Sequence, residues 1–226
     1  RVTNNQYGDG KVQNYTAVGE IEVYAYELPS VNVVRSLSAD AFSVTDYSGN
    51  AIAHVVPGRN VSDDFDYTYK NLNDGYKTSW SAIVPSVDGT EKTLGWFNVD
   101  LGAEYTVSKL MISMQHDWSG QDVVIQLANK ADFTDAVTIY NNDIDNTLGL
   151  GAATVGNVAR NASLKNYGSA GASTADNGNY FYIAPTVARY VRVTNNQYGD
   201  GKVQNYTAVG EIEVYATDVD STVKNS

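Results

Sequence analysis

The chain has 226 residues, of which 19 are glycine, 17 are tyrosine and none is cysteine, and its formal charge at pH 7 is −11. Without cysteine it forms no disulfide and no cysteine-ligated zinc site. The acidic balance argues against nucleic acid or anionic membranes as partners. The sequence contains no run of about 18 apolar residues, which is the pattern that predicts a membrane-spanning segment.

The first predicted element is a repeat. Residues 1–25 read RVTNNQYGDGKVQNYTAVGEIEVYA, and residues 192–216 are identical to them, at an offset of 191. This identity predicts neighbouring identical repeats in a longer chain, with an engineered or recombined duplication as the alternative. We expect 1–25 to be the C-terminal strand pair of a preceding repeat, 26–31 a linker with Pro29, 30–216 a complete domain, and 217–226 a polar tail.

Residues 1–25 are too few to bury a core of their own. They can exchange with 192–216 in a strand-swapped dimer, pair with a neighbouring molecule, or pack as an appendage. The sequence leaves these alternatives open.

Seven later segments alternate apolar and polar residues with period two, which is typical of half-buried strands. They are 96–101, 107–114, 123–128, 137–140, 180–183, 190–194 and 211–215. No segment sustains a helical apolar stripe over three turns, and the loops at 141–151 and 168–179 are rich in Gly, Asn and Asp. This pattern predicts an all-β sandwich or jelly roll, with Trp80 and Trp96 in its core.

Four motifs occur in a fixed order: NLNDGYKTSW at 71–80, GWFNVDLG at 95–102, ARYVRV at 188–193 and GEIEVY at 210–215. In this order they resemble the discoidin family (coagulation factor 5/8 type C domains), in its bacterial branch close to family-32 carbohydrate-binding modules. The resemblance extends over nearly the whole of 30–216. The resemblance implies a galactose-binding-like jelly-roll β-sandwich. Members bind sugars, lipid headgroups or proteins, or act as spacers, so function needs evidence from the site.

The resemblance also implies a structural calcium ion between the Asp-Gly turn and the glutamate that opens the last strand. Calcium takes six to eight oxygen ligands. The Asp74–Thr78 spacing is one residue shorter than in the family, so either the loop is tighter or Asn73 takes the aspartate role. The expected ligands are carboxylates, a hydroxyl and backbone carbonyls from Leu72, Asp74, Thr78, Val209 and Glu211. The alternative is a plain turn beside an exposed strand glutamate.

A second acidic cluster comprises Asn141, Asp143, Asp145 and Asn146. Its spacing is reminiscent of a calcium loop, but the glycine and late glutamate of an EF-hand are missing. A solvated turn is the favoured interpretation.

In the family, the glycan site lies on loops at one end of the sandwich. A sugar site needs an aromatic ring for the apolar side of the pyranose and polar groups for its hydroxyls. The loop at 115–121 and the loop at 195–206 supply such residues. Galactose binders of the family carry an arginine in the first loop, and its absence here argues against galactose-type specificity. Arg59 can substitute for that arginine if it reaches the same end of the sandwich. The candidates are His116, Asp117, Trp118, Tyr198, Asn205, Tyr206 and Arg59.

Each candidate also has a structural interpretation. Trp118 can be a buried loop anchor, His116 a structural histidine, and Arg59 a surface charge beside Asp63 and Asp64. Trp118 decides between functions, because an exposed tryptophan without a ligand is costly.

No catalytic motif is present, and the chain has only two histidines, so we expect no enzymatic activity. The sequence predicts a non-catalytic, lectin-like repeat of a bacterial secreted or cell-surface protein that binds glycans by avidity. The alternatives are a structural spacer repeat of a surface adhesin stalk and a protein-adhesion module.

Overall fold

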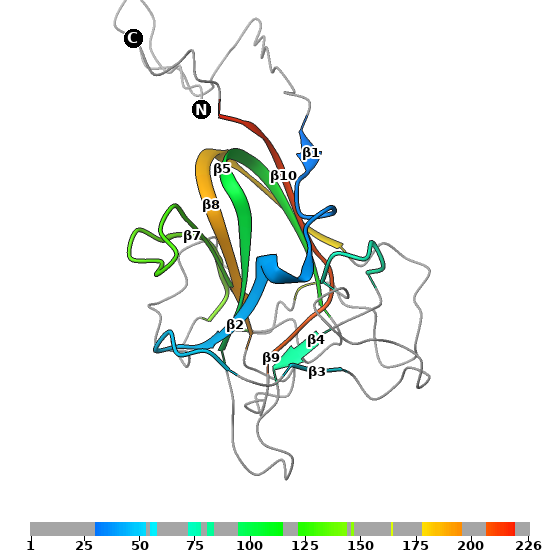
Figure 1. Cartoon of the computed structure of the whole chain (residues 1–226), viewed down its shortest axis with the longest axis vertical. Coiled ribbons are helices and arrows are strands. Elements are labelled where there is room, and N and C mark those ends of the chain that lie inside the picture. Colours follow the sequence, from blue (N-terminus) through cyan, green and yellow to red (C-terminus); the bar gives the residue numbers. More distant parts are fainter. Residues whose placement is uncertain are drawn as a thin grey trace, which may run out of the picture.

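A seven-stranded antiparallel sheet and a three-stranded antiparallel sheet make up the computed structural model (Figure 1). The structure describes residues 30–52, 55–57, 72–77, 81–83, 95–114, 122–143, 146, 164, 178–195 and 207–219. Within them the only helical element is a single 3-10 turn, η1 (Ala39–Ala41), which confirms the predicted all-β class.

The larger sheet has the strand order β1-β10-β5-β8-β6-β7, and β2 pairs with β5 outside this path. The smaller sheet has the order β3-β4-β9. The larger sheet contains β1 (Val31–Asn32), β2 (Phe42–Asp46), β5 (Gly95–Ser113), β6 (Val124–Ala128), β7 (Val137–Asn141), β8 (Gly178–Thr194) and β10 (Ile212–Asp218). The smaller sheet contains β3 (Val55–Pro57), β4 (Ser81–Ile83) and β9 (Thr207–Val209).

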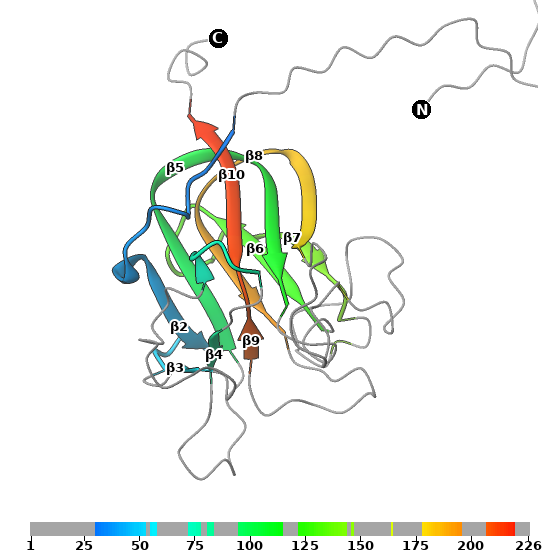
Figure 2. The ribbon, with the colours of Figure 1, turned by 90° about the vertical axis from the view of Figure 1, so that its right-hand side faces the viewer.

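Strands β5 and β8 are long and bend together over one end of the molecule (Figures 1 and 2). Their pairing is interrupted between Asp100 and Tyr105, where β5 turns through Gly102 with φ +83°. Before the bend, β5 pairs with β2, and after the bend it pairs with β10. The bend therefore divides one continuous sheet into two halves.

Both halves of β5 contribute to one buried cluster, which is the core of the domain. Phe97 and Val99 come from the first half, and Leu110 and Ile112 come from the second; all four are fully buried. Because alternate residues of a strand point to opposite faces, this cluster uses one face of the sheet throughout. Burial of each such side chain contributes roughly 1.5–3 kcal/mol relative to exposure.

Trp96 is buried, as predicted, but it lies outside that core. It belongs to a small separate cluster with Val124 and Tyr47 on the other face of the sheet. The guanidinium carbon of Arg192 lies 4.1 Å from the Trp96 ring centroid and 4.3 Å from that of Phe133. A stacked arginine therefore covers the tryptophan.

The points where the chain enters and leaves the described domain lie side by side. Val31 of β1 pairs with Ala216, and β10 continues to Asp218, which pairs with Tyr105 near the bend of β5. Strand β10 ends at Asp218, and Val31, where the predicted linker and the predicted domain overlap, belongs to β1. Ser113, the last residue of β5, lies at the opposite end, away from β1 (Figure 2).

Candidate functional site

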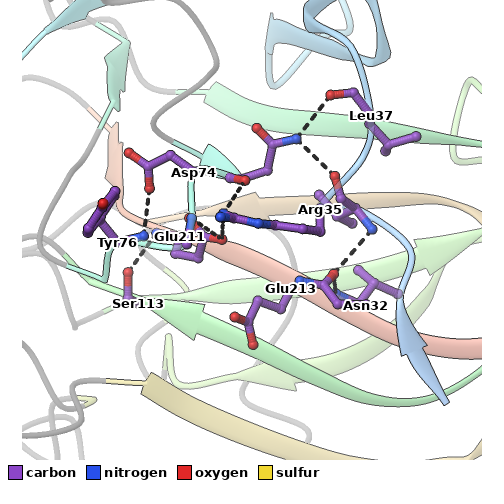
Figure 3. Close-up of polar contacts among 12 residues, drawn as sticks. Asn32, Arg35, Leu37, Asp74, Tyr76, Ser113, Glu211 and Glu213 are labelled. Carbon is purple, nitrogen blue, oxygen red and sulfur yellow. Dashed lines mark hydrogen bonds and ion pairs between the residues drawn. The ribbon is translucent and has the colours of Figure 1, made fainter. Parts of the chain in front are cut away.

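The segment 72–77 packs against the start of β10, as the calcium prediction requires. Leu72 and Val209 are fully buried in the core cluster. Asp74 accepts a hydrogen bond from the Tyr76 backbone N–H at 2.7 Å, which closes an Asx turn. Gly75 follows with φ +84°, a conformation that favours glycine. This turn presents its backbone to Glu211 (Figure 3).

Glu211 is fully buried, which contradicts the alternative of an exposed strand glutamate. Both of its carboxylate oxygens accept the backbone N–H of Gly75, each at 3.1 Å. Burial raises the pKa of Glu211 to about 8, and the nearby carboxylates of Asp74 and Glu213 also raise it. A nearby positive charge would therefore stabilise the ionised carboxylate of Glu211.

Arg35, which the sequence did not single out, supplies such a charge. Its side chain extends from the segment after β1 toward the turn at 72–77 (Figure 3). The Nη1 atom donates to the backbone carbonyl of Asn73 at 2.8 Å and lies 4.0 Å from Glu211 Oε1. No motif identifies this residue, because its contact with Asn73 spans 38 positions of sequence.

Asn73 has a structural task. Its Nδ2 atom donates to the backbone carbonyls of Val34 at 2.9 Å and Leu37 at 3.1 Å. These bonds hold the segment that carries Arg35 against the turn. The Asn73 amide is therefore oriented toward two carbonyls, which leaves Asp74 as the carboxylate of this turn.

The oxygen atoms that the described residues bring together are of the kind that binds a cation. They bring two carboxylates, Asp74 and Glu211, and the backbone of a tight turn to one place beside a buried strand end. No group of three or more His, Asp or Glu side chains arranged for a metal occurs among the residues that the structure describes, so carbonyl and hydroxyl oxygens would complete the shell. Thr78, the predicted hydroxyl ligand, lies outside the described residues.

All seven predicted glycan-binding residues also lie outside the described residues: His116, Asp117, Trp118, Tyr198, Asn205, Tyr206 and Arg59. The residues that flank two of their loops are described, and they meet. Asn195, before the second loop, donates through Nδ2 to the Met114 sulfur at 4.0 Å, and Met114 precedes the first loop. Thr207, after the second loop, donates through Oγ1 to the Asn195 carbonyl at 3.1 Å.

The loop that carries Arg59 departs from a different place. It follows Pro57, which pairs with Ser81, and Ser81 pairs with Val209. Thr207 lies at the other end of the same three-stranded sheet, opposite Ile83. Pro57, the last residue of β3, therefore lies at the opposite end of this sheet from Thr207, the first residue of β9.

The first residues of the second acidic cluster are buried, which corrects their interpretation as a solvated turn, whereas Asn146 is exposed. Asn141 and Asp143 are 2% and 0% exposed, and the Asp143 backbone N–H donates to Asn141 Oδ1 at 2.9 Å. Asn142 accepts the Val123 N–H through its side chain and so ties this segment to the start of β6. Asp145 lies outside the described residues.

The outer face of the larger sheet carries a row of residues that the sequence analysis did not identify. Tyr215, Lys109 and Tyr182 occupy directly opposed positions on β10, β5 and β8. Lys109 Nζ lies 3.7 Å from the Tyr215 ring centroid, and Tyr182 is 78% exposed. On β5 the residues of this face alternate with buried residues, and that alternation predicts that the face is exposed.

No family model matches the chain, and no curated protein matches its sequence. Solved structures match it in fold. CpGH89CBM32-6 produced by Clostridium perfringens has a TM-score of 0.40 and 14% identity over 82% of this chain and 99% of its own. CBM32-3 from a family 31 glycoside hydrolase of the same organism has a TM-score of 0.42 and 11% identity over 82% and 97%.

A family 32 carbohydrate-binding module from C. perfringens NanJ, solved in complex with galactose, has a TM-score of 0.42 and 11% identity. It covers 78% of this chain and 95% of its own length. These structures are of the kind that the sequence motifs resemble. The likeness is one of general fold, so no ligand or site residue is carried over from them.

Proposed function

We propose that this chain is a non-catalytic carbohydrate-binding module of a bacterial secreted or cell-surface protein, which binds a glycan with loops at one end of its β-sandwich. The observation that carries this proposal is the meeting of Met114, Asn195 and Thr207. All three are fully or almost fully buried, so the described residues that flank the two loops with the predicted aromatic residues meet at one buried junction. A rigid base lowers the ordering cost when loops close around a ligand.

The composition of these loops supports a neutral, hydroxyl-rich ligand. The first loop contributes His116, Asp117 and Trp118, and the second contributes Tyr198, Asn205 and Tyr206. Aromatic rings stack on the apolar side of a pyranose, and amide, carboxylate and imidazole groups pair with its hydroxyls. The chain's charge of −11 disfavours anionic polymers.

Two carboxylates of the described residues, one buried and one partly exposed, make contacts within the domain. Glu211 has no exposed surface, and both of its oxygens accept the Gly75 amide. Asp100 forms a bidentate ion pair with Arg189, at 2.8 and 2.9 Å.

A structural calcium ion is part of the proposal. Asp74 and Glu211 would hold it, with oxygens of Leu72, Thr78 and Val209 as further ligands. Its effect would be to neutralise two adjacent carboxylates and to fix the 72–77 turn against β10, at the end of the sandwich to which the loops are anchored.

The test is a glycan-array screen of the multimerised chain in the presence of calcium. We expect binding to at least one neutral glycan, loss of that binding in Trp118→Ala, and retention in Tyr182→Ala. The second variant is a matched control, because Tyr182 is an exposed aromatic residue on β8, opposite Lys109 on the outer face of the larger sheet. Thermal unfolding of each variant checks that the fold persists.

Two outcomes would contradict the proposal. Failure of the folded, calcium-loaded chain to bind any glycan would favour a structural spacer. Loss of binding in Tyr182→Ala with full binding in Trp118→Ala would move the ligand site from the loops to the sheet face.

A further inference from the structure

The Arg35 guanidinium lies against the 72–77 turn and beside the Glu211 carboxylate. Its Nη1 atom donates to the Asn73 carbonyl at 2.8 Å and is 4.0 Å from Glu211 Oε1. A Cβ atom added at Gly75 would be 2.7 Å from the guanidinium carbon of Arg35. The guanidinium therefore lies directly on the turn whose backbone N–H contacts Glu211.

The side chain of Arg35 is able to leave this position. It is 52% exposed, whereas the side chain of Glu211 is 0% exposed. Its backbone is held separately, because Asn73 Nδ2 binds the carbonyls of Val34 and Leu37 on either side of it. The guanidinium can rotate into solvent while the backbone that carries it stays in place.

We propose that Arg35 is the resident counter-charge of this site, and that calcium binds there by displacing its guanidinium. This inference rests on the calcium site of the proposed function. Two cations near the same carboxylate repel each other, so the arginine lowers the affinity for calcium and stabilises the metal-free domain. The site then responds to the calcium concentration around the protein, with the arginine setting the threshold.

The experiment is calorimetric titration of CaCl₂ into EDTA-treated and dialysed protein, with thermal unfolding of the same samples. Arg35→Gln removes the charge and keeps a long polar side chain. We expect it to bind calcium about tenfold more tightly than the wild type and to unfold at a lower temperature without metal. Arg189→Gln is the control, because Arg189 pairs with Asp100 on other strands and should leave calcium affinity unchanged.

Arg35→Lys separates charge from shape. It keeps a positive charge without the planar guanidinium, so its calcium affinity should lie between those of the wild type and Arg35→Gln. Equal or weaker calcium binding by Arg35→Gln would overturn displacement, because it would show that the arginine does not compete or that it assists the metal.

Failure of the underlying calcium proposal gives a different result. If neither the wild type nor Arg35→Gln binds calcium at millimolar concentration while both are folded, there is no calcium site, and the inference about Arg35 falls with it. Calcium binding that survives unchanged in Glu211→Gln would instead place the metal elsewhere and overturn both.

Discussion

The backbone N–H of Gly75 donates to both carboxylate oxygens of Glu211, each at 3.1 Å, across 136 positions of sequence. This contact joins the Asp-Gly turn to the start of β10. It requires the left-handed backbone that Gly75 adopts at φ +84° and leaves no room for a side chain.

We therefore expect Gly75→Ala to destabilise the domain by roughly 2 kcal/mol, through backbone strain at positive φ and displacement of the exposed Arg35 guanidinium from the turn. Gly49→Ala is the matched control, because Gly49 has φ +87° and a Cβ there would meet nothing within 4 Å. Urea unfolding should show a loss of only about 1 kcal/mol for the control. Equal losses in the two variants would show that the crowding at Gly75 relaxes without cost.

The raised pKa of Glu211 predicts how the stability of the metal-free domain depends on pH. Because its folded pKa of about 8 exceeds the ordinary 4.5, the folded state holds the proton more tightly than the unfolded state. The charged groups that surround it are Asp74 and Glu213, which oppose ionisation, and Arg35, which favours it. The stabilising contribution should be complete below about pH 4.5 and lost as the pH rises to about 8.

Thermal unfolding in EDTA at several pH values from 5 to 8.5 would measure this effect. We expect the free energy of unfolding to fall by roughly 2–4 kcal/mol more in the wild type than in Glu211→Gln. A parallel pH dependence in the two proteins would show that Glu211 titrates normally.

Asn73→Asp tests the role of the amide that holds the Arg35 segment. The substitution turns a donor to two carbonyls into an acceptor, so we expect a loss of about 2–3 kcal/mol of stability. Asn129→Asp is the control, since its Nδ2 donates to one carbonyl, that of Val187, at an exposed position. If Asn73→Asp instead strengthened calcium binding without loss of stability, residue 73 would take the aspartate role that the sequence left open.

Arg192→Lys tests the stacked arrangement over Trp96. Lysine keeps the charge but loses the planar group between the two rings and the Nε donor to Gln126 at 2.7 Å. We expect a loss of roughly 1–2 kcal/mol in urea unfolding. Arg189→Lys, in a half-exposed ion pair, should cost less than about 1 kcal/mol. Equal costs would show that stacking adds nothing to the charge.

The alternating segments predicted most of the larger sheet but divided its longest strands. Segments 96–101 and 107–114 are the two halves of β5, and 180–183 and 190–194 belong to β8. The residues that separate the two segments of each strand, 102–106 and 184–189, are mostly exposed or partly exposed, and the first stretch contains Gly102. Their sequence therefore resembles that of turns. In the structure they form the bend, where the pairing of β5 with β8 stops after Asp100 and resumes at Tyr105, so each strand continues through it. Periodicity cannot distinguish such a bend from a turn.

The short strands β3, β4 and β9 were missed for another reason. Each has three residues, which is too few for alternation to be recognised. In the site, Asp74 and Glu211 followed from motifs, but Arg35 did not, because its role depends on contacts between segments far apart in sequence. Gly75 carried a local signal, since Asp-Gly is a typical turn pair.

The adjacent entry and exit of the domain restrict how far a chain of such units can reach. The offset of 191 residues maps Asp218 onto position 27 of the preceding unit, so only residues 28–30 connect it to Val31. A connector of that length spans at most about 14 Å between consecutive units. A tandem array would thus gain little length from each domain. The body of each unit would project from the short connection, because the entry and the exit lie at the same end of the domain.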